Sequence, residues 1–398
     1  MSGSGFAQAV VFSFMANPVA TREAVNQTAA NAGMKLSTPG LDKRFDARGA
    51  TFLGSVLAEA VKAVVKAQSE SESILSRFNG VYIGDSTIVK LPKALVGMYQ
   101  GSNGVEDAAA KVAVQWELDK GGLSLWLSDG TIHDQRTGIV SHTLPAGALR
   151  LNDLGFFNLE TFAADIHDGV YFFSRYKVGT LVYTEGGQTL DLARYLRQQG
   201  QQACDLPIQL GAKRLPCRLI ALPVSPEQVG KRRKRLRDIA RRKQQPLSER
   251  ALALAAWTLF VTNIPPDMLS TAEAAVLGCT RWQIECLFKL WKSDGRLDES
   301  RSHDPYRVLC EFYARLLALL IQHWIMVVGC WQHLDRSLHQ ATQVIRKRAF
   351  CLLDALSDVA ALTSALQKTA VVMAQTCHLS KRATCPLTFQ RWLGSAHG

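Results

Sequence analysis

The stretch from Arg281 to Lys292, RWQIECLFKLWK, most constrains what this chain can fold into. Its apolar residues recur at the spacing of one helix face, and at ~100° per residue one acid and two cations fall within about 40° of one another. The segment is therefore predicted to be a helix that buries one side and carries a carboxylate and two cations along its edge. The charged residues are Arg281, Glu285 and Lys292, and the apolar stripe is Ile284, Leu287, Phe288 and Trp291. An amphipathic helix with an ordinary i, i+4 charge pair explains the same pattern.

Two upstream segments favour a role in metal binding. Val81–Val89 is rich in strand-forming residues and contains a single acid, Asp85, and Leu149–Phe157 is a short apolar run with one acid, Asp153. An acid inside an apolar strand is unfavourable to bury unless it is paired or bound to a metal. Together with Glu285, these residues supply three carboxylates, and carboxylate oxygens are ligands that suit Mg²⁺.

These motifs resemble those of the DDE transposases of bacterial insertion sequences. The resemblance extends from roughly residue 40 to residue 335, with the motifs in the family's order. The branch that the chain resembles carries a tyrosine–arginine–glutamate–lysine signature around the last acid. Arg281, Glu285 and Lys292 match the last three positions, whereas the tyrosine position falls on Gly278. The matching stretches are IGDSTIVKLP around Asp85, NDLGFF around Asp153, VTNIP at Val261–Pro265 and RWQIECLFKLWKS at Arg281–Ser293.

The resemblance implies an α/β (α+β) fold with a ribonuclease H-like catalytic core, a β-rich insertion, and helical N- and C-terminal regions. It also implies that Asp85, Asp153 and Glu285 are both catalytic residues and ligands of Mg²⁺, for which Mn²⁺ is a substitute. Two such ions about 4 Å apart activate the attacking oxygen and stabilise the leaving oxygen of a phosphodiester. The expected reaction cuts the element ends and joins their 3′ ends to target DNA. A stand-alone metal-dependent nuclease is an alternative, and so is a catalytically idle DNA-binding remnant of a mobile element, although the presence of all three acids argues against the remnant.

Changes in composition and hydrophobic periodicity along the chain predict five regions. The first, 1–75, is a helical DNA-binding region that is short for a complete end-recognition module, so we expect a truncated or wrongly placed start. The core begins at 76–177, where a hairpin is predicted around Lys120–Gly122. The remaining regions are a β-rich insertion ending in a basic helix at 178–250, the second part of the core with the Glu285 helix at 251–335, and a helical C-terminal region at 336–398.

The run Lys231–Lys243 contains nine cations and one acid and is predicted to be a helix with a basic surface. Such blocks are often solvated or disordered. In a chain with a candidate metal site we favour contacts to DNA phosphates, which position a protein on DNA but carry no sequence information. Ordinary surface charge is the alternative for Lys289, and a core position is the alternative for Trp257, to which the resemblance assigns stacking on a flipped base. The predicted DNA-binding residues are Arg281, Lys292, Lys289, Trp257, Arg232, Arg233 and Arg235.

The composition agrees with an anionic partner. The formal net charge of +12 points first to nucleic acid and second to an anionic membrane surface. We expect a homodimer assembled on double-stranded DNA, in the cytoplasm and associated with the nucleoid. No signal peptide is predicted at the N-terminus. The apolar stretch Phe312–Trp331 contains Arg315, Gln322 and His323, and is predicted to be a buried helix and not a membrane span.

Overall fold

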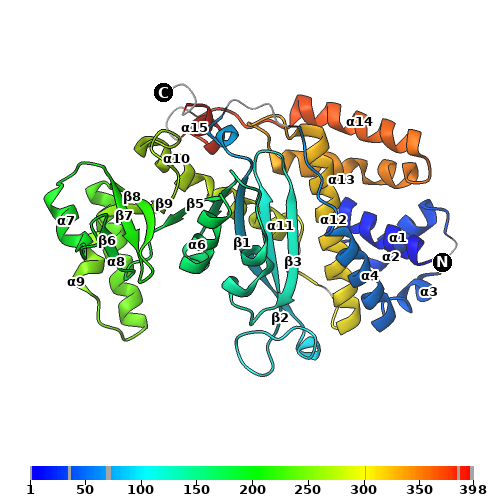
Figure 1. Ribbon diagram of the computed structural model, residues 1–398. Helices are drawn as coiled ribbons and strands as arrows, with labels where there is room; N and C mark the ends of the chain where they lie inside the picture. Colours follow the sequence, from blue (N-terminus) through cyan, green and yellow to red (C-terminus); the bar gives the residue numbers. More distant parts are fainter. Residues whose placement is uncertain (1, 35–36, 69–72, 301, 383–385, 395–398) are drawn as a thin grey trace. The chain divides into compact units, whose positions relative to one another are not determined.

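The computed structural model describes residues 2–34, 37–68, 73–300, 302–382 and 386–394 (Figure 1). The chain forms two compact units, each drawn from segments that are distant in sequence. The first unit takes residues 1–71, 84–141 and 283–390, and the second takes residues 72–83, 142–282 and 391–398. Both units contain helices and strands, which confirms the predicted α+β class.

Three neighbouring strands in the order β3-β2-β1 form the β-structure of the first unit. They are β1 (Val81–Leu91), whose first three residues belong to the second unit, β2 (Ala108–Glu117) and β3 (Leu123–Asp129). Strands β2 and β3 pair antiparallel, with Val112 opposite Leu127. The turn between them has Gly121 at a φ of 78°, a conformation that glycine adopts without strain. The predicted hairpin is therefore confirmed.

Helices make up the rest of the first unit. The central one is α12 (Pro305–Cys330), against which α1, α4, α13 and α14 pack (Figure 1). By length and composition α12 could cross a membrane, but 83% of its most apolar window is buried inside the protein. The prediction of a buried helix is confirmed. The other helices are α1 (Gly3–Ala16), α2 (Arg22–Asn31), α3 (Thr38–Asp42), α4 (Ala47–Ala60), α5 (Gly138–Ser141), α11 (Trp282–Ser293), α13 (Leu338–Ala355) and α14 (Val359–Thr376). Helix α15 (Thr388–Gly394), near the end of the chain, has residues in both units.

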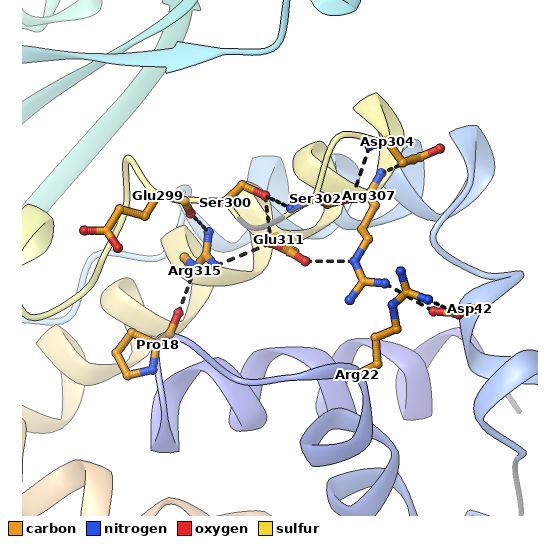
Figure 2. Close-up of polar contacts among 10 residues, drawn as sticks. All are labelled: Pro18, Arg22, Asp42, Glu299, Ser300, Ser302, Asp304, Arg307, Glu311 and Arg315. Carbon is orange, nitrogen blue, oxygen red and sulfur yellow. Dashed lines mark hydrogen bonds and ion pairs between the residues drawn. The ribbon is translucent and has the colours of Figure 1, made fainter.

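A network of ion pairs fastens the N-terminal helices to α12 (Figure 2). Asp42 lies 2.8 Å from Arg22 and 3.2 Å from Arg307. One helical turn further along α12, Glu311 accepts a hydrogen bond of 3.0 Å from Arg307 and lies 3.4 Å from Arg315. Because Glu311 is only 5% exposed, its charge is tolerable only with these partners in place. The N-terminal helices are thus an integral part of the first unit.

The buried His323 on α12 makes the stability of this unit depend on pH. Its Nε2 atom lies 2.7 Å from the carbonyl oxygen of Gly121, and its ring packs edge-to-face against Trp116 and Trp331. Burial lowers the pKa of His323 to about 4. The unfolded chain, with an ordinary histidine pKa near 6.5, therefore takes up a proton that the folded chain does not. The contribution of the neutral, buried His323 to the free energy of unfolding is fully present above about pH 6.5 and is lost progressively as the pH falls toward 4.

We predict that this histidine lowers the free energy of unfolding of the first unit by about 1.3 kcal/mol between pH 7.5 and pH 5.5. His323→Gln keeps an N–H donor for the carbonyl of Gly121 but cannot take up the proton, so its stability loss over this range should be smaller by that amount. Urea unfolding of both proteins at the two pH values measures the difference. Equal losses in both proteins would show that His323 does not titrate as described.

The second unit is a longer run of strands in the order β4-β5-β9-β8-β7-β6. Strands β4 and β5 are parallel and are joined by α6, and the remaining neighbours are antiparallel. The strands are β4 (Leu149–Asn152), β5 (Tyr171–Arg175), β6 (Val182–Thr184), β7 (Cys204–Leu210), β8 (Leu215–Pro223) and β9 (Trp257–Thr262). The helices are α6 (Leu159–His167), α7 (Leu192–Gln198), α8 (Pro226–Arg242), α9 (Glu249–Leu254) and α10 (Thr271–Thr280).

Two elements of the second unit differ from the sequence expectation. The segment from 178 to 222 was expected to be strand-like throughout, yet it contains α7, whose N-terminus is capped by the Asp191 carboxylate. The buried Leu192 and Leu196 of α7 pack into the same core as β7 and β8, so tertiary packing stabilises a helix that is only seven residues long. The approach to β9, expected to be extended from Ala251, begins as the helix α9.

Candidate active site

Asp85 lies in the interior of β1 and is half-buried. Its Oδ1 atom accepts a 2.8 Å hydrogen bond from the backbone N–H of Ser86. The Ser86 hydroxyl donates to Asp134 at 2.7 Å, and the buried Lys111 of β2 donates to the same Asp134 oxygen at 2.9 Å. Burial by itself raises the pKa of Asp134, but the hydrogen bonds from Ser86 and Lys111, with the lysine charge, bring this pKa below its usual value. The acid in β1 therefore adjoins a charged network.

Helix α11 has the predicted form. The four residues of the predicted apolar stripe, Ile284, Leu287, Phe288 and Trp291, are all buried. Glu285 is half-buried, and Lys289 is exposed to solvent. Lys292, two turns after Glu285, donates a 3.2 Å hydrogen bond from its ammonium group to the carbonyl oxygen of Ile88. This contact fastens α11 to β1 at a point three residues beyond Asp85.

Asp153 belongs to the second unit. It was predicted to lie within a strand, but β4 ends at Asn152 and Asp153 begins the short 3₁₀ turn Leu154–Phe156. Its side chain is 40% exposed, and its Oδ1 atom lies 3.6 Å from Nε of Arg281. The structure thus brings together one predicted catalytic acid and one predicted phosphate-binding arginine.

Gly278, at the tyrosine position of the signature, lies on α10 in close contact with β9. A Cβ atom at this position would come within 2.5 Å of the ring of Phe260. That ring packs in turn on Phe173, with 4.7 Å between the ring centroids. A tyrosine therefore cannot occupy position 278 unless the aromatic packing between β5 and β9 changes. The glycine at the tyrosine position of the signature is therefore part of the packing between α10 and β9.

The basic run forms α8 from Lys231 to the end of the helix, and its cations divide into two groups. Arg232 donates hydrogen bonds of 2.9 Å to the carbonyl of Trp257 and to the hydroxyl of Thr258. Burial, with the nearby Arg175, lowers the pKa of Arg232. Arg233 donates to the carbonyl of Leu252 at 3.1 Å. These two arginines, predicted to bind DNA, fasten α8 to β9 and α9. The third, Arg235, is exposed, as are Lys231, Lys234, Arg237, Arg241, Arg242 and Lys243.

Trp257 is a core residue of the second unit. It is 7% exposed and belongs to the hydrophobic cluster formed by β5 to β9 and their helices. It also lines a cavity of about 460 Å³ together with Arg233 and Arg237. The role of Trp257 in stacking on a flipped base stays a prediction.

The three acids suit a hard divalent cation in chemistry and in accessibility, because all are carboxylates and all are partly exposed. Asp85 and Glu285 are in the first unit, and Asp153 is in the second. In the described chain, no group of three or more histidine, cysteine, aspartate or glutamate side chains is placed to hold a metal ion.

Comparisons with known proteins identify the family. Residues 77–321, more than half of the chain, match the family model of the transposase DDE domain. The chain is 28% identical to the transposase for insertion sequence element IS231F of Bacillus thuringiensis subsp. israelensis over 312 residues, which are 73% of this chain and 65% of the relative. It is 28% identical to the IS231B transposase of Bacillus thuringiensis subsp. berliner over 344 residues, 80% of this chain and 72% of the relative. The IS1151 transposase of Clostridium perfringens is 26% identical over 315 residues, 73% of this chain and 67% of the relative. The chain therefore belongs to the family of DDE-type transposases of insertion sequences.

Proposed function

We propose that this protein is a DNA transposase that cuts element ends and joins the 3′ ends to target DNA by two-metal phosphoryl transfer. The observation that carries the proposal is the contact between Lys292 and Ile88, which fixes α11 to β1. Glu285 precedes Lys292 by about 10 Å along the helix, and Asp85 precedes Ile88 by about 10 Å along the strand. We propose that α11 runs beside β1 in the strand's direction, which would bring the two carboxylates level with each other.

The ion pair between Asp153 and Arg281 supports the placement of the third acid. Arg281 lies in the turn between α10 and α11, four residues before Glu285. The proposal places Asp153, held at Arg281, near the metal ion that Glu285 would bind. We propose that the three acids converge in this way within a ribonuclease H-like core, which the β-rich insertion interrupts. The division of the chain into five regions belongs to the same proposal.

In this proposal different side chains bind the metal ions and the DNA phosphates. When bound, Mg²⁺ would activate the attacking oxygen and stabilise the leaving oxygen, and Mn²⁺ would substitute for it. Asp85, Asp153 and Glu285 would hold the ions. Arg281 contacts a flanking phosphate through its planar guanidinium group, whereas Lys289 and Lys292 act as point charges. The proposed partner is double-stranded DNA, bound by a homodimer in the cytoplasm at the nucleoid.

The test is an assay with Mg²⁺ and DNA that carries the ends of the protein's own element. A transposase nicks at the end and then joins that 3′ end to a target strand, because water and a 3′-hydroxyl group attack within the same two-metal site. Cleavage without a joined product would support a stand-alone nuclease. Binding with neither reaction would support an idle remnant.

We propose that the exposed cations of α8 bind DNA phosphates. Lys234→Gln combined with Arg235→Gln should weaken binding to unrelated DNA sequences equally. It should also reduce the slope of log affinity against log salt concentration by about 1.8, since each phosphate contact contributes about 0.9. Filter binding at several salt concentrations measures both effects. The matched control neutralises two exposed cations of the same unit outside α8, Lys177 and Arg194, and should leave the slope unchanged. An unchanged slope in the α8 variant would make the run an ordinary solvated face.

A further inference from the structure

We propose that Ser86, Asp134 and Lys111 are positioning residues that orient the Asp85 carboxylate for metal binding. The inference rests on the proposed function, because it takes Asp85 as a metal ligand. All four residues belong to the first unit, and they form one chain of hydrogen bonds. The sequence motifs of the family point to Asp85 alone. The three other residues come together through the pairing of β1 with β2 and the loop after β3.

The network begins at a buried charge. The Lys111 side chain is 8% exposed, and its ammonium group lies 2.9 Å from Oδ1 of Asp134. A lysine charge in this position is strongly destabilising without a partner, so the ion pair fixes Asp134 over β2. The same Oδ1 atom accepts the Ser86 hydroxyl hydrogen at 2.7 Å. A hydrogen bond to a carboxylate is stronger than one between neutral groups, so Asp134 in turn fixes Ser86.

Fixing Ser86 orients Asp85 through the backbone. The N–H group of Ser86 donates to Oδ1 of Asp85 at 2.8 Å, so the direction of this N–H sets the direction of that carboxylate oxygen. Successive side chains of a strand point to opposite faces. Ser86 can therefore be anchored on one face of β1 and orient Asp85 on the other face, without contacting the metal ion that Asp85 would bind. A metal ligand held by such supporting groups loses less conformational freedom when the ion binds.

The test measures Mn²⁺ binding to the full-length protein, with free Mn²⁺ followed by electron paramagnetic resonance. Ser86→Ala removes the hydroxyl group and keeps the backbone N–H, and it should raise the Mn²⁺ dissociation constant by about 10- to 100-fold, the usual effect of losing a group that supports a metal ligand. Asp134→Asn, a second variant that keeps the side-chain size, should change the constant in the same direction. Ser86→Thr keeps the hydroxyl group and should bind within about threefold of the wild type.

The controls separate this inference from the proposed function. Ser128→Ala changes a serine of β3 opposite Lys111 and should leave Mn²⁺ binding unchanged. Asp85→Asn should abolish binding at this site. Equal Mn²⁺ affinity in Ser86→Ala, Asp134→Asn and the wild type would overturn the positioning role and leave the metal site intact. A wild-type protein with no Mn²⁺ binding that depends on Asp85 would overturn both the site and its positioning residues.

Discussion

Glu285→Gln should reduce both Mg²⁺-dependent nicking and 3′-end joining to the level of DNA without protein, while DNA binding is retained. Glutamine has nearly the size of glutamate, so the half-buried position on α11 is filled as before. It lacks the anionic oxygen that a divalent cation requires. In the proposed mechanism nicking and joining use the same pair of metal ions, so both steps should disappear together. Gel assays of nicked and joined products, beside a binding assay, measure the three activities on one preparation.

A matched control excludes a general effect of losing one negative charge. Glu59→Gln makes the same chemical change on α4, where the side chain is 73% exposed and paired with Lys62. An exposed ion pair contributes about 0–1 kcal/mol, so this variant should nick and join as the wild type does. Joining that survived Glu285→Gln would show that another acid completes the site.

The second large effect concerns β4, the strand that ends directly before Asp153. Arg150 in β4 donates to both carboxylate oxygens of Asp165 on α6, at 2.9 and 3.1 Å from Nε. The two side chains are 4% and 5% exposed. Asp165→Asn removes the carboxylate charge that faces the buried arginine, which should lower the free energy of unfolding of the second unit by about 3–5 kcal/mol. Urea or thermal unfolding followed by circular dichroism measures the loss.

Two further variants identify the cause of that loss. Asp168→Asn, one residue after the same helix, changes an exposed carboxylate and should alter stability by no more than about 0.5 kcal/mol. Replacing both partners, Arg150→Met with Asp165→Leu, removes the buried charges together and should recover most of the lost stability. A loss below about 1 kcal/mol in Asp165→Asn would mean that this ion pair does not hold β4 to α6.

Local patterns in the sequence predicted much of the fold. The period of Ile284, Leu287, Phe288 and Trp291 predicted the helix and its buried face, and the alternation on each side of Lys120–Gly122 predicted the hairpin. These features depend on residues that are close in sequence. Helix α7 was missed because only its Asp191 cap signals a helix, and its stability comes from packing against distant strands.

The parts of the site that depend on distant contacts could not be predicted. Arg232 has the same composition signal as Arg235, and only the position of β9 decides that one is engaged internally while the other is exposed. Asp134 and Ser86 are 48 residues apart, and no periodicity relates them. Lys111 offered one usable signal, since a lysine inside the apolar run AAAKVAV requires a buried partner. The sequence does not specify which acid that partner is.

A crystal structure with Mn²⁺ tests the proposed convergence of Asp85, Asp153 and Glu285 most directly. Anomalous scattering locates the ions independently of the protein coordinates. The proposal predicts two Mn²⁺ ions about 4 Å apart, with carboxylate oxygens of all three residues as ligands. Carboxylates more than roughly 10 Å from one another, or Mn²⁺ bound by other residues, would contradict it, since a two-metal site cannot span that distance.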